Sequence, residues 1–392
     1  MIHHNNNDKG NLLVVGSVDK MEMVVGESTE QNGSLDQEQL QVLFRKEAVY
    51  QISDVPCCAV PHERICTEDW RQKICSWSYK VVDTFRLDRS IVATSMKLLD
   101  RFMLLLDNNN SSTIGSSSSL PSSCPCMSCK RSLDSSQFQL ASMATLCIAI
   151  KISPEADSEG ELERRKHFQV TTMVDFSRGL FSQQDIARME GKVLSTLSWE
   201  VNPPTATLFI PYLLGLLPPV EALPLVTRQC YPVAHKFLTE VSRYLCELAV
   251  SLGKDFNDAL PSEVAFSSLL VAVKLLTVHA LPEDTRVQFC NAFYQQLPSK
   301  PRHERIGILV SKLLAVLWPE MLLEHSQCND PTHPISMALH YGLVDLSCIQ
   351  KQPCHVDSGA STASPPQSPM VSYGTPYPAT YDSPVSAINS YV

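Results

Sequence analysis

The spacing of apolar residues between positions 67 and 318 restricts the fold of this chain more than any other feature. In one stretch after another, apolar side chains recur every three or four residues, which is the period of one helical face. Proline and glycine punctuate the joints between these stretches. No convincing run shows the strict alternation expected of a half-buried strand. The sequence therefore predicts an all-α fold in preference to an α/β one.

The first half of the chain predicts five helices. The second of them carries two adjacent apolar stripes after a capping Asp88, so we expect it near the centre of a bundle. The third opens at the capping box Ser136-x-x-Gln139. The fifth opens at Ser182-x-x-Asp185 in the same way. The expected ranges are 67–85, 88–106, 136–151, 167–176 and 182–197.

The second half predicts five more helices, again separated by proline or glycine. A chain of 392 residues is too long for one core, because single cores stop growing at roughly 250 to 300 residues. We therefore expect two bundles, one in residues 37–202 and one in residues 203–318. The helices of the second are expected at Thr205–Leu217, Val233–Leu252, Ser262–Leu276, Glu283–Gln296 and His303–Leu317.

Three segments lack the helical pattern and are expected to be disordered. Residues 1–36 form an N-terminal arm, residues 107–135 a low-complexity Ser/Asn-rich insertion, and residues 319–392 a Ser/Pro-rich regulatory tail. Such compositions do not bury enough apolar surface to offset the entropy of ordering. After the arm, an amphipathic segment from Gln37 to Val49 is expected to form an outlying helix.

The tail holds four Ser-Pro or Thr-Pro pairs, which begin at Ser364, Ser368, Thr375 and Ser383. Two interpretations stay open. Either the tail is simply solvated, or these four residues accept phosphate from a proline-directed kinase and so regulate the lifetime or the binding of the protein.

The cysteines, the longest apolar segment and the net charge limit the classes of protein to which this chain can belong. The fourteen cysteines are scattered through apolar helices and no secretory signal precedes them, so we expect reduced, intracellular thiols. Cys124, Cys126 and Cys129 offer three thiols where a closed zinc site needs four ligands, which favours spectator thiols over a metal site. The longest apolar segment, 138–150, falls short of the ~20 residues of a membrane span. A net charge of -9 disfavours broad nucleic-acid binding.

Four charged residues lie on helices that are otherwise apolar, where an ionised group is tolerated only with a partner. Arg71 and Asp100 fall on neighbouring helices, so we expect them to pair in a buried, charge-assisted hydrogen bond with a structural role. Lys151 and Glu190 fall at the edge of the bundle. They are expected either to form an ordinary surface salt bridge or to offer donors and an acceptor to the backbone of a partner helix.

Motifs for catalysis do not accompany these residues. The sequence has no phosphate-binding glycine loop, no His-Glu-x-x-His and no nucleophile elbow, and its eleven histidines show no ligand spacing. We therefore predict a protein that is not an enzyme and that uses neither a cofactor nor a metal.

Taken in order, the singled-out residues resemble the cyclin box. The second half is similar to the companion cyclin fold, in which a Glu-Leu helix precedes a Pro-Ser at the start of a small-residue helix. The joint at residues 197–205 resembles that of D-type cyclins, and the resemblance spans roughly residues 40 to 318. It implies two tandem five-helix bundles. The five hallmark positions of the cyclin box correspond to Arg71, Asp100, Leu140, Lys151 and Glu190.

This resemblance implies a regulatory subunit that binds and activates a cyclin-dependent protein kinase in cell-cycle control, in the nucleus and the cytoplasm. Leu140, Lys151 and Glu190 would contact the kinase, while Arg71 and Asp100 would hold the box together. Kinase substrates or inhibitors would be further partners, whereas nucleic acid and membranes are not expected. Two alternatives stay open, a cyclin-fold adaptor in transcription and a helical scaffold without a kinase partner.

The resemblance also implies a substrate-docking patch on the first helix, at Trp70, Ile74 and Trp77. Family members usually have apolar residues where this chain has Trp70 and Lys73. A charged Lys73 would be costly beneath an inserted leucine. We therefore expect peptides of the Arg-x-Leu type to dock poorly here.

Overall fold

The computed structural model describes residues 29–50, 68–111, 135–153, 170–253, 256, 258–297, 303–317, 319, 322 and 332–349. Within these ranges every regular element is a helix, apart from an isolated antiparallel bridge between Leu276 and Val344. The predicted all-α fold class is therefore confirmed. Much of the predicted arm (1–28), insertion (112–134) and tail (350–392) lies outside the described residues.

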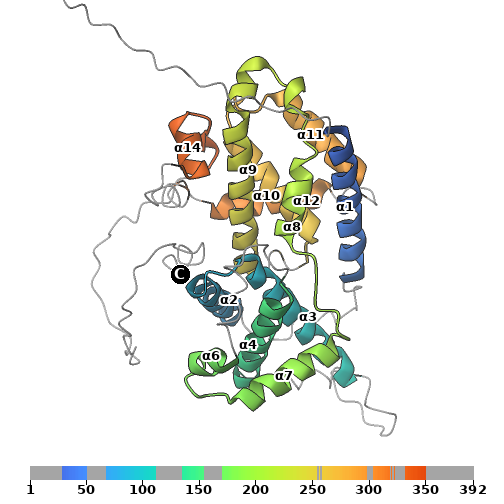
Figure 1. Ribbon diagram of the computed structural model, residues 1–392, viewed down its shortest axis with the longest axis vertical. Helices are drawn as coiled ribbons and strands as arrows, with labels where there is room; N and C mark the ends of the chain where they lie inside the picture. The colour runs from blue at the N-terminus through green and yellow to red at the C-terminus, as the bar shows by residue number, and fades with distance from the viewer. Residues whose placement is uncertain are drawn as a thin grey trace, which may run out of the picture.

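The first bundle contains helices in all five places where the first half of the sequence predicts them (Figure 1). They are α2 (Glu68–Thr84), α3 (Ser90–Ser111), α4 (Ser135–Ile152), α6 (Val170–Phe176) and α7 (Gln183–Thr196). The insertion was expected to begin at residue 107, but residues 107–111 continue α3 as a helix. Extending an existing helix costs much less than starting one, which explains the difference.

Helix α4 is the centre of the first bundle. Every residue from Ala141 to Ile150 is buried, and α3 and α7 pack against this helix. Side chains of α2, α3 and α7, among them Val82, Leu99 and Ile186, complete a continuous apolar cluster that we call the first core. A helix that is apolar all round is expected at such a buried position.

The second bundle lies next to the first, and Figure 1 shows one end of α9 reaching the first bundle. Its apolar cluster, which we call the second core, includes Phe209, Phe237 and Phe266. A short 3-10 turn, η2 (Val220–Ala222), joins its first two helices. These helices are α8 (Ala206–Leu214), α9 (Leu225–Leu252), α10 (Pro261–Leu275), α11 (Glu283–Gln296) and α12 (His303–Val316).

Helix α9 begins earlier than the sequence predicts. The expected start was Val233, directly after a proline, whereas the helix runs from Leu225 with Pro232 inside it. A proline removes one intrahelical hydrogen bond and usually interrupts a helix. Thr227 and Ala234, on either side of Pro232, are buried, so the packing of this helix outweighs that cost.

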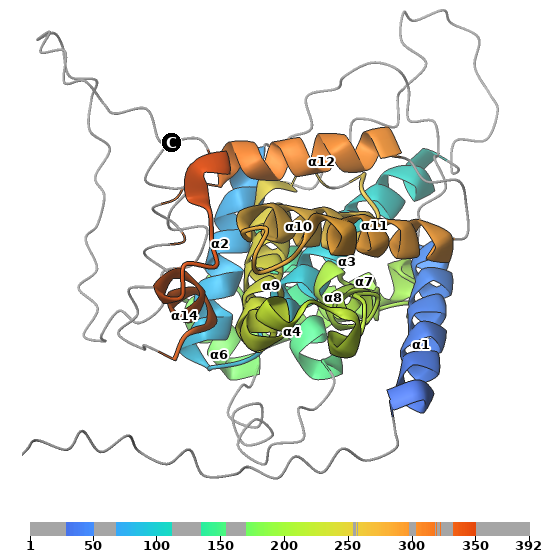
Figure 2. The same cartoon turned by 90° about the horizontal axis from the view of Figure 1, so that it is seen from above.

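Helix α1 (Thr29–Tyr50) packs on the second bundle, although it precedes the first bundle in sequence (Figure 2). Leu40 and Phe44 belong to the second core, and the ring of Phe44 lies 5.7 Å from that of Phe209 in α8. The predicted arm reached residue 36, but residues 29–36 form the first turns of α1. The sequence-based prediction grouped residues from 37 onward with the first bundle. The sequence shows that α1 has an apolar face but does not reveal which bundle this face contacts. The division of the chain at residue 202 stays a prediction.

A carboxylate near the C-terminal end of α1 binds the start of α10. Both oxygens of Glu47 accept hydrogen bonds from Ser262 at the start of α10, one from the backbone N–H and one from the hydroxyl, each at 2.7 Å. The start of a helix offers unpaired N–H groups and favours negative charge. Burial nevertheless dominates and raises the pKa of Glu47 from 4.5 to about 7, while the Ser262 hydrogen bonds act in the opposite direction.

Part of the predicted tail belongs to the folded structure. Ile335 and Ala338 enter the second core, and the Thr277 N–H donates to the Leu343 carbonyl at 2.8 Å. The boundary of the tail at residue 319 therefore does not hold for residues 332–349, whose apolar pattern is too short to reveal a helix in the sequence. This segment contains α14 (Pro334–His340), which packs on α9, and the 3-10 turn η4 (Leu346–Cys348).

The packing of α14 can be tested by truncating its buried side chain. We expect Ile335→Ala to lower the free energy of unfolding by about 2–5 kcal/mol, the usual cost of removing a buried aliphatic side chain. Urea unfolding of the full chain, followed by circular dichroism, measures this change. Tyr341→Ala is the matched control, since Tyr341 is 63% exposed in the same segment and should change stability by less than about 0.5 kcal/mol. Equal effects of the two substitutions would contradict the assignment of Ile335 to the core.

The raised pKa of Glu47 predicts a dependence of stability on pH. Because its folded pKa of about 7 lies above 4.5, the folded state holds more protons between these values. The stability that this group contributes is therefore complete below about pH 4.5 and is lost as the pH rises through about 7. Glu47 titrates roughly between pH 5 and pH 7.5, and the unfolding free energy should fall across this range. We expect Glu47→Gln to flatten that fall, as measured by urea unfolding at each pH. Glu38→Gln, at an exposed position of α1, should leave the curve unchanged, and parallel curves for wild type and Glu47→Gln would contradict the prediction.

Candidate functional site

An ion pair joins the last turn of α4 to the middle of α7. The Lys151 Nζ lies 2.7 Å from Oε1 and 2.9 Å from Oε2 of Glu190. The Lys151 side chain is 54% exposed, whereas that of Glu190 is 12% exposed. The sequence therefore identified two residues that the structure brings together at the surface, with the ammonium more accessible than the carboxylate.

Local sequence fixes where Glu190 lies. The capping box that was expected at the start of α7 is present, because the Ser182 hydroxyl accepts from the Asp185 N–H and the Asp185 carboxylate accepts from the Ser182 N–H. The buried face of α7 carries Ile186 and Met189. Glu190 follows directly, at the rim of that face, where it can meet Lys151.

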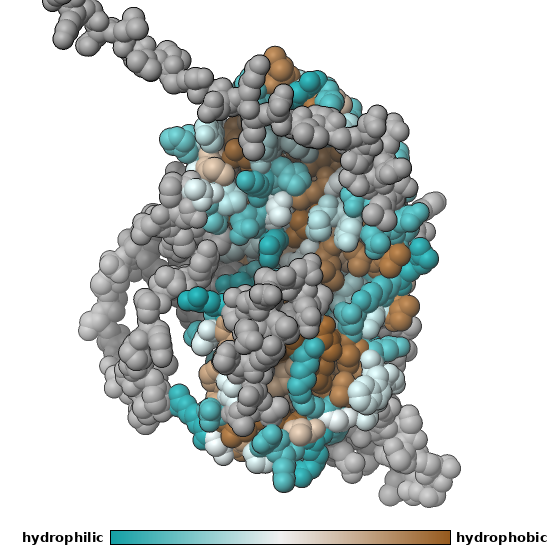
Figure 3. Space-filling view, viewed as in Figure 1, coloured by the Kyte–Doolittle hydropathy of each residue, from teal (hydrophilic) through white to brown (hydrophobic). Residues whose placement is uncertain are grey.

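Half-buried apolar side chains lie on the helices that carry or flank the pair. Leu140 lies on α4 eleven residues before Lys151, close to three helical turns, so the two share one side of α4 about 16 Å apart. Leu140 is half-buried, as are Met103 and Leu106 of α3 and Leu194 of α7, and all four pack against the first core. Figure 3 shows hydrophobic residues gathered on the visible face of the first bundle, over α3 and α4.

This arrangement offers two kinds of contact. An ammonium carries three donors, and the pair with Glu190 leaves Lys151 able to donate to a further acceptor. The half-buried apolar side chains can supply area. An arrangement of this kind can contact another protein through both hydrogen bonds and apolar area.

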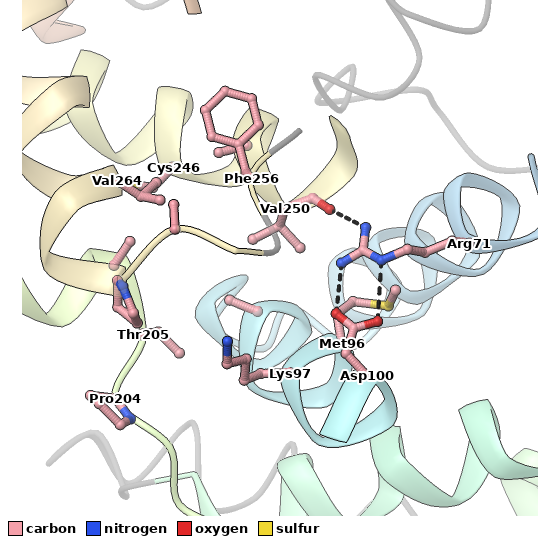
Figure 4. Close-up of a pocket in the computed structure, with 15 residues that line it drawn as sticks. Arg71, Met96, Lys97, Asp100, Pro204, Thr205, Cys246, Val250, Phe256 and Val264 are labelled. Carbon is pink, nitrogen blue, oxygen red and sulfur yellow. Dashed lines mark hydrogen bonds and ion pairs between the residues drawn. The ribbon is translucent and has the colours of Figure 1, made fainter. Parts of the chain in front are cut away.

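Arg71 and Asp100 form the second pair, and it lies inside the protein (Figure 4). The Arg71 guanidinium donates to both Asp100 carboxylate oxygens, through Nε at 3.3 Å and Nη2 at 3.1 Å, and through Nη1 to the Val250 carbonyl at 2.7 Å. The pair was expected to fix α2 against α3. Its third contact also reaches α9 of the second bundle, and no sequence signal indicated this.

A second arginine crosses between the bundles, and the sequence analysis did not identify it. The Arg89 Nε lies 2.9 Å from a carboxylate oxygen of Glu247 in α9, and its guanidinium stacks over the Tyr79 ring at 4.8 Å. Burial raises the pKa of Glu247 to about 7, and the charge of Arg89 acts against this shift. A carboxylate between apolar neighbours, in the run Cys246-Glu247-Leu248, is the sequence signal that could have indicated a buried partner.

Arg101 is a third buried cation that the sequence analysis left without a partner. It donates to the backbone carbonyl of Glu200 at 2.8 Å and to the Glu200 carboxylate at 3.0 Å. Its guanidinium also lies over the Tyr50 ring at 4.7 Å. Arg101 therefore ties α3 to the joint between α7 and α8 and to the end of α1.

The expected docking patch on α2 is only partly on the surface. Trp70 is 40% exposed and Lys73 is exposed, but Ile74 is buried in the first core and Trp77 is half-buried. Ile74 therefore packs inside the bundle and is not available to an incoming peptide without rearrangement.

Several expected features fall outside the described residues. These are the Ser364, Ser368, Thr375 and Ser383 positions and the thiols of Cys124, Cys126 and Cys129. Cys75, Cys147, Cys230, Cys246 and Cys290 are free, and no group of three or more metal-ligating side chains occurs within the described part of the chain. No helix there is long and apolar enough to cross a membrane.

Comparisons with known proteins bear on the same region. Residues 126–202 match the family model of the cyclin N-terminal domain; this segment includes Leu140, Lys151 and Glu190 but not Arg71 or Asp100. No curated protein sequence matches the chain. Among solved structures, the X-ray structure of a viral cyclin from herpesvirus saimiri is similar, with 16% sequence identity over 71% of this chain and 95% of the other, at a TM-score of 0.41.

Removal of the Arg71 side chain tests the junction. We expect Arg71→Ala to lower the free energy of unfolding by about 1–3 kcal/mol, because it leaves the half-buried Asp100 carboxylate and the Val250 carbonyl without their charged donor. Urea unfolding of the full chain measures this loss. Lys73→Ala, at an exposed position two residues away on α2, is the control and should change stability by less than about 0.5 kcal/mol. A loss no larger than that of the control would show that the pair does not stabilise the fold.

Proposed function

We propose that this chain belongs to the cyclin family and is a non-catalytic subunit that binds and activates a cyclin-dependent protein kinase in cell-cycle control. The observation that carries the proposal is the Lys151–Glu190 pair, which lies within the matched cyclin N-terminal domain and presents an exposed ammonium. An isolated surface ion pair contributes little to stability, about 0–1 kcal/mol. Its value in this position would therefore lie in recognition.

Activation of a kinase by a partner is a shift between two conformations. The catalytic lysine of a kinase must pair with the glutamate of its mobile αC helix, and its activation loop must be ordered. A partner that binds only the helix-in conformation raises its population. A shift from 1:99 to 99:1 needs about 5.5 kcal/mol of preference for that conformation.

A preference of that size calls for an extensive interface with apolar contacts. The half-buried side chains Leu140, Met103, Leu106 and Leu194, on α3, α4 and α7, would supply such area. Lys151 and Glu190 would then position the backbone of the kinase helix through directional hydrogen bonds. The affinity would come from the apolar area, and the correct register from the two charges.

The preformed junction between the bundles supports this mechanism. Arg71, Arg89 and Arg101 each join parts that are distant in sequence. A surface held in place before binding loses less conformational entropy when a partner docks, which leaves more of the interaction energy for the kinase.

Regulation through the tail is a further part of the proposal. Phosphorylation of Ser364, Ser368, Thr375 or Ser383 would add about two negative charges at each site and change the lifetime or the binding of the complex. Action on a kinase of the cell cycle would require the protein in the nucleus and the cytoplasm, and we propose that location for it.

The double substitution Lys151→Ala with Glu190→Ala tests the proposed contact. We expect it to reduce activation of the co-purified kinase by more than about tenfold, because the kinase helix would lose the directional hydrogen bonds that set its register. Affinity purification followed by a histone-type kinase assay measures the effect, and circular dichroism checks that the fold is unchanged.

The matched control is Lys80→Ala with Glu221→Ala, which removes the same charges from exposed positions outside the site. This control should activate the kinase as the wild type does. Full activation by the Lys151→Ala, Glu190→Ala protein would refute the assigned roles. Failure of the wild-type chain to retain any kinase would instead favour a scaffold without a kinase partner.

A further inference from the structure

A cavity lies at the junction of the two bundles, apart from the Lys151–Glu190 pair (Figure 4). It opens between α3, the chain at Pro204 to Ala206, the end of α9 and the start of α10, and its volume is about 90 Å³. This volume corresponds to roughly three water molecules of the liquid. Most of the side chains around it are apolar, and its charged lining residues are Arg71, Lys97 and Asp100.

Two of these three charges already satisfy one another. Arg71 donates to both carboxylate oxygens of Asp100 and to the carbonyl of Val250. The carboxylate of Glu47 also lies near enough to act on the cavity electrostatically, but both of its oxygens accept from Ser262. Arg71, Asp100 and Glu47 therefore already have hydrogen-bond partners within the protein.

Lys97 is the exception. Its side chain is half-buried, and no group in the described part of the chain forms a hydrogen bond or ion pair with its ammonium. Figure 4 shows its nitrogen directed toward the space beside Pro204 and Thr205. Burial is the largest influence on Lys97 and lowers its pKa; Asp100 and Glu47 act to raise it, while Arg101 and Arg71 act with burial.

The chemistry of a complementary ligand follows from these charges. A partly buried ammonium without an acceptor is costly, and an anion in the cavity would remove that cost. A phosphate dianion would meet repulsion from the Asp100 and Glu47 carboxylates. A single carboxylate would match the one unpaired cation, and a small hydrocarbon body would match walls such as Met96, Ala249 and Val264.

We propose that this cavity binds a small monocarboxylate, whose carboxylate accepts from the Lys97 ammonium and whose hydrocarbon part contacts the apolar walls. The same chemistry has two sources, a free short-chain acid and the carboxylate end of a polypeptide. The proposal goes beyond kinase binding and does not depend on it, because the cavity is formed by this chain alone.

The test uses the full chain without a kinase, and propionate with its neutral isostere propionamide as probes. Ligand-observed NMR titration measures the two dissociation constants. We expect propionate to bind roughly tenfold more tightly than propionamide, the difference made by one hydrogen bond between charged groups. Equal binding of the two probes would overturn the proposal.

Three variants locate the binding. Lys97→Met keeps the length of the side chain and removes its charge, so it should abolish the preference for propionate. Ala93→Leu fills the cavity from α3 without a change of charge and should weaken both probes. Lys80→Met removes a charge from an exposed position of α2 and should change nothing. A similar loss in Lys97→Met and Lys80→Met, or unchanged propionate binding in Ala93→Leu, would overturn the assignment to this cavity.

A second titration, with peptides, distinguishes a free acid from the carboxylate end of a polypeptide. N-acetyl-alanyl-alanine is compared with its C-terminal amide in the same titration and in the same variants. Tighter binding of the peptide acid than of propionate, lost in Lys97→Met, would support the site and identify a polypeptide end as its occupant. Binding of propionate alone would support the site and identify a free acid.

Discussion

The pairing of buried arginines with acceptors in α9 is the constraint on which the arrangement of the two bundles depends. Arg71 reaches the Val250 carbonyl while it holds Asp100, and Arg89 reaches the Glu247 carboxylate. A buried charge that loses its partner costs about 3–5 kcal/mol. Rotation of one bundle against the other would separate Arg89 from Glu247 and so carry a penalty of this kind. Apolar contacts alone would tolerate small rotations, because they have no preferred direction, whereas a hydrogen bond from a guanidinium requires a particular geometry. The junction thus gives the chain a single shape to present to a partner.

The position of the Lys151–Glu190 pair follows from the burial of α4. Every residue from Ala141 to Ile150 is enclosed by the first core, so Lys151, in the last turn, is the first place where a charged side chain of this helix can reach solvent. The end of a helix also favours positive charge, because its unpaired carbonyls carry partial negative charge. On α7, the capping box at Ser182 fixes the helix start and so places Glu190 at the rim of the buried face. The same forces that build the core therefore bring the two charges together at its edge.

Much of the fold was predictable from the sequence, and the errors have a common physical cause. The apolar period identified α2, α4 and α7 because each buries a long regular face. It missed the first part of α9, since Pro232 normally ends a helix and only burial of residues on either side retains it. It also missed α14, whose seven residues are too few to show a period. The four charged residues were found because they stand alone in apolar runs. Their acceptors in α9 were not found, because Arg71 and Val250 are 179 positions apart and such a contact leaves no local pattern in the sequence.

The candidate partner site and the junction between the bundles lie in different places, and this separates their roles. Lys151, in the last turn of α4, and Glu190, in the middle of α7, belong to one bundle. The junction also includes the second bundle, at the last residues of α9, the start of α10 and the chain before α8. Helix ends carry unpaired backbone groups and cannot interlock as helix sides do, which favours a cavity at this junction. Substitutions at the two places share no partner, so their effects on stability should be nearly additive. A ligand at the junction could therefore stabilise the relative placement of the bundles while leaving the surface that carries Lys151 unoccupied and free for a protein partner.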